Sequence, residues 1–77
     1  MVKSMNNYHI NIFYSAADGG YIADIPDLKF CSAFGETPEK ALAEVMIAKK
    51  LWLEAASATG RKIPKARYRP AIYQIAQ

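Results

Sequence analysis

One stretch of the chain, residues 37–60, carries the signals of a single long helix. Thr37 can cap its first turn, and Pro38 suits the first helical position because its missing N–H would be unpaired there. Gly60 can end the helix, since glycine adopts the left-handed conformation at little cost. At about 1.5 Å per residue, such a helix is roughly 30 Å long, about the width of a small domain. A chain of 77 residues has room for one such element, so the other residues have to form the surface on which it packs.

The helical wheel divides the large apolar side chains between a broad face and a separate pair. A rotation of about 100° per residue gathers on the broad face Ala41, Leu42, Val45, Trp52, Leu53 and Ala56. This pattern predicts a helix laid across a sheet. Ile47 and Leu51 point the other way, one turn apart, and we interpret them as contacts with another subunit. Because 77 residues lie near the size at which a single core is barely sufficient, we expect a homo-oligomer, either a dimer or a tetramer.

The residues before the helix predict three antiparallel strands. Residues 8–14 alternate in polarity, with tyrosine and isoleucine at every second position on one face. Asp18-Gly19-Gly20 supplies a tight turn, after which residues 21–25 return as a second strand. Residues 28–34 contain two β-favouring phenylalanines and predict a third strand that ends before the helix cap.

The residues after the helix predict one more strand. Ile63-Pro64 excludes an immediate second helix, and residues 71–75 are apolar enough for a fourth strand. This strand can pair within the domain or with the sheet edge of a partner. The expected fold class is therefore α+β with the order β-β-β-α-β, a three-stranded antiparallel sheet packed by one long helix plus a C-terminal strand. We expect one domain over residues 1–77, with residues 1–7 frayed.

The composition is that of a globular protein, with 52% hydrophobic and 22% charged residues. No apolar run approaches the roughly 18 to 20 residues that a membrane span needs, and the first residues lack the apolar core of a signal peptide. We therefore expect a cytoplasmic protein with no membrane association. Cys31 is the single cysteine, which excludes a disulfide framework and a cysteine-based metal site and favours a small buried hydrophobic residue.

The candidate chemical groups do not form a catalytic pattern. His9 is the single histidine, and no serine or cysteine stands near it in the arrangement of a triad. Asp18, Asp24 and Asp27 lie around the second strand, where paired carboxylates can bind a divalent metal or act as acid and base. A turn explains Asp18, and the Pro26-Asp27 reversal explains Asp27. We predict a binding or assembly module without a cofactor, and not an enzyme.

The formal net charge of +3 is unevenly distributed. No acidic residue follows Glu54, and the segment after the helix contains Arg61, Lys62, Lys65, Arg67 and Arg69. Lysine and arginine neutralise phosphates, so this segment is a candidate for contact with DNA or RNA. The alternative is a solvated connector, since the segment has no recognition helix and no aromatic platform motif.

Several short motifs, taken together and in order, resemble the HicB-like antitoxin family over residues 8–75. The motifs are Asp18-Gly19-Gly20-Tyr21, Ile25-Pro26-Asp27-Leu28, Cys31, Gly35-Glu36-Thr37-Pro38-Glu39-Lys40-Ala41-Leu42, Leu51-Trp52-Leu53-Glu54 and Ile63-Pro64. The resemblance implies a partial ribonuclease H-like domain without that enzyme's catalytic carboxylates. It also implies the antitoxin of a type II toxin–antitoxin pair, which binds and masks a HicA-type RNA-cleaving toxin. The chain is similar to the short, stand-alone members, and it departs from many of them in having Lys29-Phe30 where they have Pro-Gly.

The resemblance also suggests which residues meet the toxin. A toxin that binds RNA must present a basic surface, and carboxylates on the antitoxin are its electrostatic complement. The candidates for contact with the toxin are Asp24, Glu36, Asp18 and Asp27. The alternative interpretation for each is a turn or cap residue. Two further interpretations stay open: a nucleic-acid-binding protein that uses the basic segment, and a homo-oligomeric structural domain without a toxin.

Overall fold

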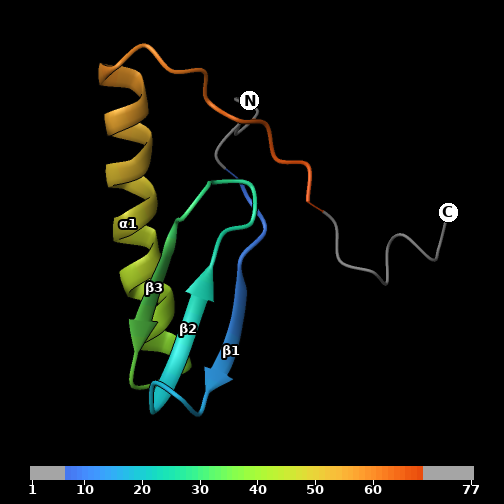
Figure 1. Cartoon of the computed structure of the whole chain (residues 1–77), viewed down its shortest axis with the longest axis vertical. Coiled ribbons are helices and arrows are strands. Elements are labelled where there is room, and N and C mark those ends of the chain that lie inside the picture. Colours follow the sequence, from blue (N-terminus) through green and yellow to red (C-terminus); the bar gives the residue numbers. More distant parts are fainter. Residues whose placement is uncertain (1–6, 69–77) are drawn as a thin grey trace, which may run out of the picture.

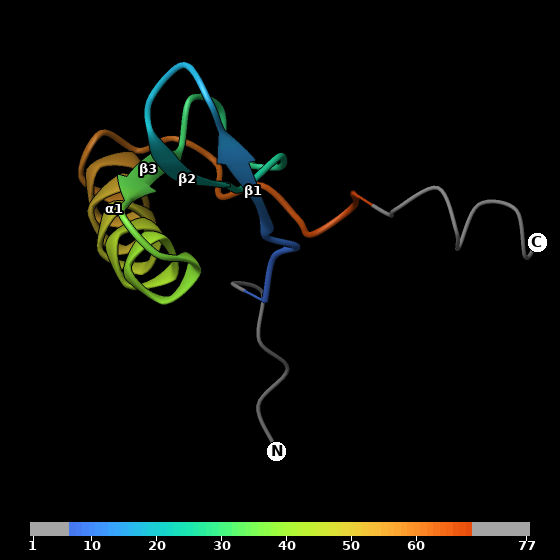
Figure 2. The ribbon, with the colours of Figure 1, turned by 90° about the horizontal axis from the view of Figure 1, so that it is seen from below.

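The computed structural model describes residues 7–68, which form three strands and one helix in the order β1 (Asn11–Ser15), β2 (Gly20–Asp24), β3 (Ser32–Gly35) and α1 (Pro38–Ala58). The strands make one antiparallel sheet in the order β1-β2-β3 (Figure 1). Helix α1 lies against one face of this sheet and packs mainly on β3 and β2 (Figure 2). The α+β class and the succession of three strands and a helix are thus confirmed. The predicted strand at 71–75 and the predicted frayed residues 1–6 lie outside the described residues.

Strands β1 and β2 form the predicted hairpin. Their register pairs Asn11 with Asp24 and Ser15 with Gly20, and the backbone N–H of Gly19 donates to the carbonyl of Ser15 across the turn. Gly19 has φ 72°, a conformation that glycine adopts without strain. The first strand starts at Asn11 and not at residue 8 as predicted. The reason is Tyr8, whose ring is buried in the core and whose hydroxyl donates to the carbonyl of Pro64.

The third strand is shorter than predicted, because residues 28–31 belong to a loop closed by its own hydrogen bonds. The N–H of Leu28 donates to the carbonyl of Ile25 at 3.0 Å, and the N–H of Cys31 donates to the carbonyl of Leu28 at 3.1 Å. The N–H of Ile25 then closes the loop on the carbonyl of Cys31 at 3.0 Å. These local bonds replace the ladder bonds of a strand, so β3 begins only at Ser32. We call residues 25–31 the β2–β3 loop.

The helix begins and ends where the sequence predicts. The side chain of Thr37 accepts a hydrogen bond from the backbone N–H of Lys40 at 3.1 Å, and Pro38 is the first helical residue. At the other end, Gly60 has φ 75° and donates to the carbonyl of Ser57, while Arg61 donates to that of Ala56. This pair of bonds is a Schellman motif, which satisfies the last carbonyls and turns the chain back along the helix.

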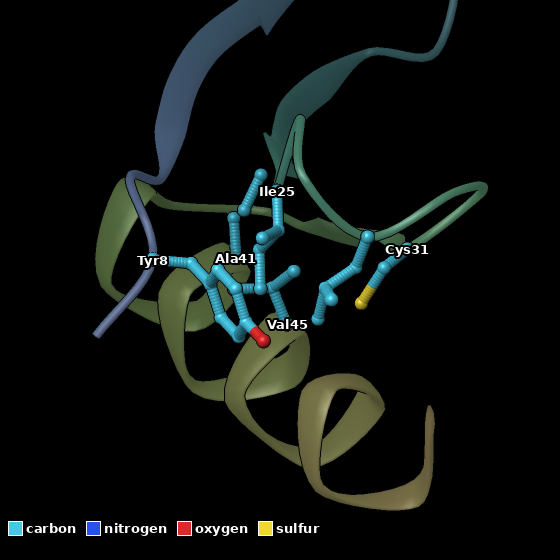
Figure 3. Close-up of a cluster of buried hydrophobic side chains, with 7 residues drawn as sticks. Tyr8, Ile25, Cys31, Ala41 and Val45 are labelled. Atoms are coloured by element: carbon cyan, nitrogen blue, oxygen red, sulfur yellow. The ribbon is translucent and has the colours of Figure 1, made fainter. Parts of the chain in front are cut away.

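The core lies between α1 and β2, with the β2–β3 loop and Tyr8 closing its ends (Figure 3). Its buried members are Tyr8, Ala23, Ile25, Leu28, Cys31, Ala41 and Val45. The predicted helix face is confirmed at its centre, where Ala41, Val45 and Ala56 are buried and Trp52 and Leu53 are partly buried. The prediction is wrong for Leu42, which is exposed because the sheet reaches only the centre of this face and not its margin.

The closest approach of sheet and helix is at Gly35, the last residue of β3. A Cβ added at this position would stand 2.2 Å from the backbone N of Ala41 and 2.6 Å from the carbonyl carbon of Lys40. Both atoms belong to the first turn of the helix, which Thr37 and Pro38 hold in place. Glycine at residue 35 therefore sets how closely the helix can lie on the sheet.

We predict that Gly35→Ala destabilises the fold by about 3 kcal/mol, because the new methyl group meets backbone atoms that cannot rotate away. Urea denaturation followed by circular dichroism measures the free energy of unfolding. Ser32→Ala is the matched control, since Ser32 is exposed on the same strand, and it is expected to stay within about 0.5 kcal/mol of the unchanged chain. Equal stability of the two variants would show that the contact between β3 and α1 is not a tight one.

Candidate functional site

Within residues 7–68, no helix or strand covers the sheet face opposite α1, which is apolar at its centre; we call it the open sheet face. Cross-strand pairing places Phe13, Ile22 and Phe34 in one row across β1, β2 and β3. Phe13 is 51% exposed and Phe34 is 43% exposed, which is high for aromatic residues on paired strands. Single exposed apolar side chains are common, but a contiguous row on a sheet indicates a contact surface.

A candidate carboxylate borders this row on each side. Asp24 stands in the next row of the open sheet face, paired with Asn11 and Ser32, and is half-buried. Glu36 follows β3 at the other end of the face. It lines a hollow of about 390 Å³ together with Phe34 and with Glu44 of the helix. Two of the predicted contact residues therefore lie beside the same apolar row.

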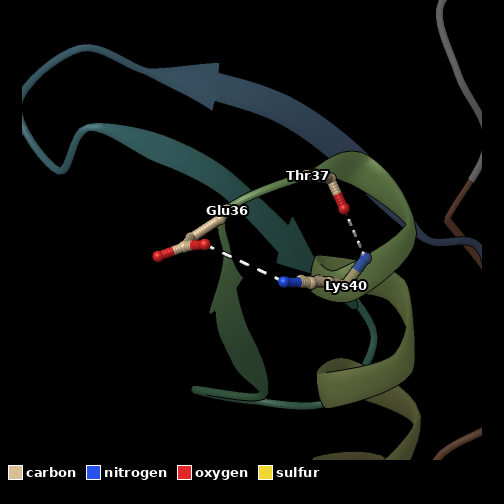
Figure 4. A network of polar contacts seen from close by, with 3 residues as sticks. All are labelled: Glu36, Thr37 and Lys40. Carbon is tan, nitrogen blue, oxygen red and sulfur yellow. Dashed lines mark hydrogen bonds and ion pairs between the residues drawn. The ribbon is translucent and has the colours of Figure 1, made fainter.

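Glu36 is weakly held. Its Oε1 lies 3.8 Å from Nζ of Lys40, one helical turn on, and both side chains are largely exposed (Figure 4). An ion pair of this length in water contributes little to stability. The Glu36 carboxylate can therefore be redirected to a cation of a partner at small cost.

The other two predicted carboxylates have local structural partners. Asp18 Oδ2 accepts a hydrogen bond from the Ser15 hydroxyl at 2.8 Å within the hairpin turn. Asp27 Oδ2 accepts two backbone hydrogen bonds, from Arg67 at 2.9 Å and from Tyr68 at 3.0 Å. These contacts match the turn interpretation for Asp18. The backbone of Asp27 forms the predicted reversal, closed by the N–H of Leu28 on the carbonyl of Ile25, and its carboxylate has a further role, which is to hold the segment after the helix against the β2–β3 loop.

The basic residues after the helix form part of a second hollow. It has a volume of about 290 Å³, and its lining includes Lys62, Lys65, Arg67 and the carboxylate of Asp27. Arg61 lies outside this lining, with its guanidinium carbon 5.9 Å from the centroid of the Trp52 ring. The structure thus brings the predicted cations 61–67 to one end of the domain, while Arg69 lies outside the described residues.

His9 and Cys31, the other candidate chemical groups, have structural roles. His9 Nε2 lies 2.7 Å from Oδ1 of Asn11, and the His9 ring packs 4.8 Å from that of Tyr68. Burial, and to a smaller extent the Asp24 carboxylate, raises the pKa of the Cys31 thiol, so this thiol is protonated at neutral pH. Among residues 7–68, no three histidine, cysteine or acidic side chains gather in a way that could hold a metal ion.

The outer surface of the helix exposes the pair that the wheel singled out. Ile47 is 54% exposed and Leu51 is 58% exposed, on the side of α1 turned away from the core. Their exposure agrees with the predicted orientation. Their role as a subunit contact stays a prediction, because the structure contains a single chain.

Comparison with known proteins identifies the family. No protein-family model matches the chain, and no solved structure matches it either. The chain is 50% identical over 58 residues to the UPF0150 protein ssl0259 of Synechocystis sp., a match that covers 75% of this chain and 78% of the relative. The chain belongs to the UPF0150 family. A second Synechocystis member, the UPF0150 protein ssr1765, is 35% identical over 63 residues, which cover 82% of this chain and 78% of that protein.

The names of these UPF0150 relatives state neither an activity nor a partner, so the function has to be argued from the surfaces of the domain. In the part of the UPF0150 chain that the structure describes, no helix combines the length and the apolar character needed to cross a membrane.

Some residues of these surfaces were missed by the sequence interpretation. The alternation of residues 8–14 places Phe13 opposite the core-facing side chains, but it does not reveal that Ile22 and Phe34 align with it. Glu44 is an exposed helix residue, and only the position of β3 shows that it shares a hollow with Glu36. Both observations follow from the strand register, which the sequence does not determine to better than one or two residues.

We predict that the stability of this UPF0150 fold falls at alkaline pH. Burial raises the pKa of Cys31 above its ordinary value of 9.0 and that of Tyr8 above 10.0. Between the ordinary and the raised values, the unfolded chain has lost these protons while the folded chain retains them. The free energy of unfolding therefore decreases as pH rises through this range, and it is unaffected by these two groups below about pH 8.

Urea titrations from about pH 7 to pH 11 test this prediction. The variants Cys31→Ala and Tyr8→Phe each remove one of the two groups, so each is expected to lose stability less steeply above about pH 9. An alkaline slope that is the same in both variants and in the unchanged chain would assign the effect to other groups.

Proposed function

We propose that this UPF0150 protein is a HicB-like antitoxin domain that binds and masks a HicA-type RNA-cleaving toxin. The observation that carries the proposal is the open sheet face, with its row of Phe13, Ile22 and Phe34 and a carboxylate on each side of that row. The order of motifs that resembles the HicB-like family supports the same function. The proposal includes a partial ribonuclease H-like relationship for the fold.

The chemistry of the open sheet face suits a basic protein partner. Aromatic and aliphatic side chains at the centre of an interface supply apolar burial, and charged groups at its border supply orientation and a faster encounter. Asp24 and Glu36 occupy such border positions. A toxin surface that binds RNA phosphates is basic, so the same cations would be neutralised here and withheld from RNA. The proposal places the protein in the cytoplasm, where such a toxin meets its RNA.

We predict that Asp24→Lys weakens toxin binding at least tenfold, or about 1.4 kcal/mol, because a like charge replaces the complement of a basic surface. The measurement is calorimetric titration against a purified HicA-type toxin, with RNA cleavage assayed in parallel. Asp18→Lys is the matched control, since it reverses the same charge in the hairpin turn, away from the apolar row.

Each outcome of this titration has a defined meaning. Unchanged affinity in Asp24→Lys would remove Asp24 from the interface, and an equal loss in Asp18→Lys would reduce the effect to net charge. Failure of the folded, unchanged protein to bind the toxin at all would contradict the antitoxin proposal.

We also infer that the protein is a homo-oligomer in which Ile47 and Leu51 form the contact between subunits. A small domain that exposes two large aliphatic side chains one helical turn apart gains stability by covering them. A symmetric dimer is the simplest arrangement, because it places this helix flank against its own copy, and a tetramer is the alternative.

We predict that Ile47→Glu converts the oligomer to monomers, because it places two like charges at an apolar contact. Sedimentation velocity ultracentrifugation measures the change. Met46→Glu is the matched control, since Met46 is a similarly exposed apolar residue on the same helix that points about 100° away. An oligomer that persists in Ile47→Glu would exclude this flank as the contact.

A further inference from the structure

Phe30, in the β2–β3 loop, has an exposed side chain and a left-handed backbone, and both are energetically unfavourable for a phenylalanine. Its side chain is 93% exposed, so it gains almost nothing from burial. Its backbone has φ 62°, in the left-handed region that costs a residue with a Cβ free energy and that glycine adopts freely. The left-handed backbone belongs to the turn that the N–H of Cys31 closes on the carbonyl of Leu28, but glycine would form this turn without strain, so the turn does not explain the aromatic side chain.

The loop around Phe30 is fixed on both sides, so the ring has a defined position. Leu28 and Cys31 are buried in the core, with exposures of 1% and 2%. Trp52 Nε1 donates a hydrogen bond to the carbonyl of Lys29 at 2.9 Å, which ties the loop to the last third of the helix. Phe30 is therefore an aromatic ring held out into solvent by an ordered backbone.

One cationic side chain lies beside this ring, and others lie on the segments that contact its loop. Nζ of Lys29 lies 5.7 Å from the centroid of the Phe30 ring. Arg61 lies over Trp52, the residue that holds the loop, because the Schellman motif turns the chain back along the helix. Lys62, Lys65 and Arg67 line the adjoining hollow. We call Lys29, Phe30, Arg61, Lys62, Lys65 and Arg67 the basic–aromatic end.

One carboxylate, that of Asp27, lines the same hollow as these cations and binds the backbone of the basic segment. Asp27 shares the hollow with Lys62 and Lys65, and its Oδ2 accepts the backbone N–H groups of Arg67 and Tyr68. This latch holds the basic segment beside the β2–β3 loop, as Figure 1 also shows. The positive charge of the basic–aromatic end is thus held next to the exposed ring.

We propose that the basic–aromatic end binds single-stranded nucleic acid, with Phe30 stacking on an unpaired base and the cations contacting the phosphates on either side. A single strand alternates flat apolar bases with phosphates, which matches a protruding ring flanked by cations. A duplex hides the faces of its bases, and the basic–aromatic end presents no helix for a groove. The inference is independent of the antitoxin proposal, because it uses another surface.

Fluorescence anisotropy with a labelled RNA of about 12 nucleotides, compared with the same RNA annealed to its complement, tests the proposal. The single strand is expected to bind more tightly than the duplex, and its affinity to fall between about 50 mM and 200 mM salt. Lys62→Gln and Lys65→Gln are each expected to reduce the salt slope by about 0.7, the value for one phosphate contact with a single strand.

Phe30→Gly is the decisive variant. Glycine adopts φ 62° without strain and no packing is lost, so the variant is expected to melt at or above the temperature of the unchanged chain. Its affinity for the single strand is expected to fall roughly five- to 150-fold, the range measured for loss of one stacked base. Phe13→Ala is the matched control, an exposed aromatic residue of the open sheet face, and it should bind RNA like the unchanged chain.

Three results would overturn the proposal: equal affinity of Phe30→Gly and the unchanged chain, equal affinity for single strand and duplex, or displacement of the RNA by an equally charged acidic peptide at the same concentration. The last result would assign the basic–aromatic end to an acidic protein. A toxin titration of Phe30→Gly separates the two proposals, since this variant should lose affinity for RNA and bind toxin normally.

Discussion

The contact between β3 and the first turn of the helix determines the rest of this structure. Gly35 has no side chain, and Ala23 and Ala41 are fully buried between the sheet and the helix, so the two layers can lie close together. Close packing of small residues leaves few gaps and stabilises the core through many short contacts. It also commits the single described helix to one face of the sheet. The open sheet face follows directly from this arrangement.

Hydrogen bonds between side chains and distant backbone groups hold the parts outside the sheet and the helix in place. Hydrogen bonds of Tyr8, Asp27 and Trp52 connect the chain ahead of β1, the β2–β3 loop and the segment after the helix, and join residues up to 56 positions apart. Each uses a side-chain group to satisfy a backbone N–H or carbonyl that no strand or helix satisfies. The basic segment therefore has a fixed place on the domain although it lies outside the sheet and the helix.

The two proposed binding surfaces differ in chemistry and in construction. The open sheet face is an apolar row bordered by Asp24 and Glu36, built on paired strands. The basic–aromatic end is cationic and is built on a loop and an extended segment. The row of Phe13, Ile22 and Phe34 and the basic–aromatic end share no residue, so each can be changed without removing a side chain of the other. A domain with this arrangement can contact a basic protein and an RNA through different surfaces.

The sequence by itself determined the elements whose signals are local. The cap at Thr37, the proline after it and Gly60 gave the limits of the helix, and Asp18-Gly19-Gly20 gave the hairpin, because each depends on backbone preferences within a few residues. The tertiary structure alone decided how Phe13, Ile22 and Phe34 align, since strand register depends on pairing with another strand. It also decided that Asp27 is a latch and that Phe30 is exposed. The role of Asp27 depends on a segment some 40 residues further along the chain, which contacts the β2–β3 loop. The exposure of Phe30 depends on the core, which buries Leu28 and Cys31 and leaves Phe30 in solvent.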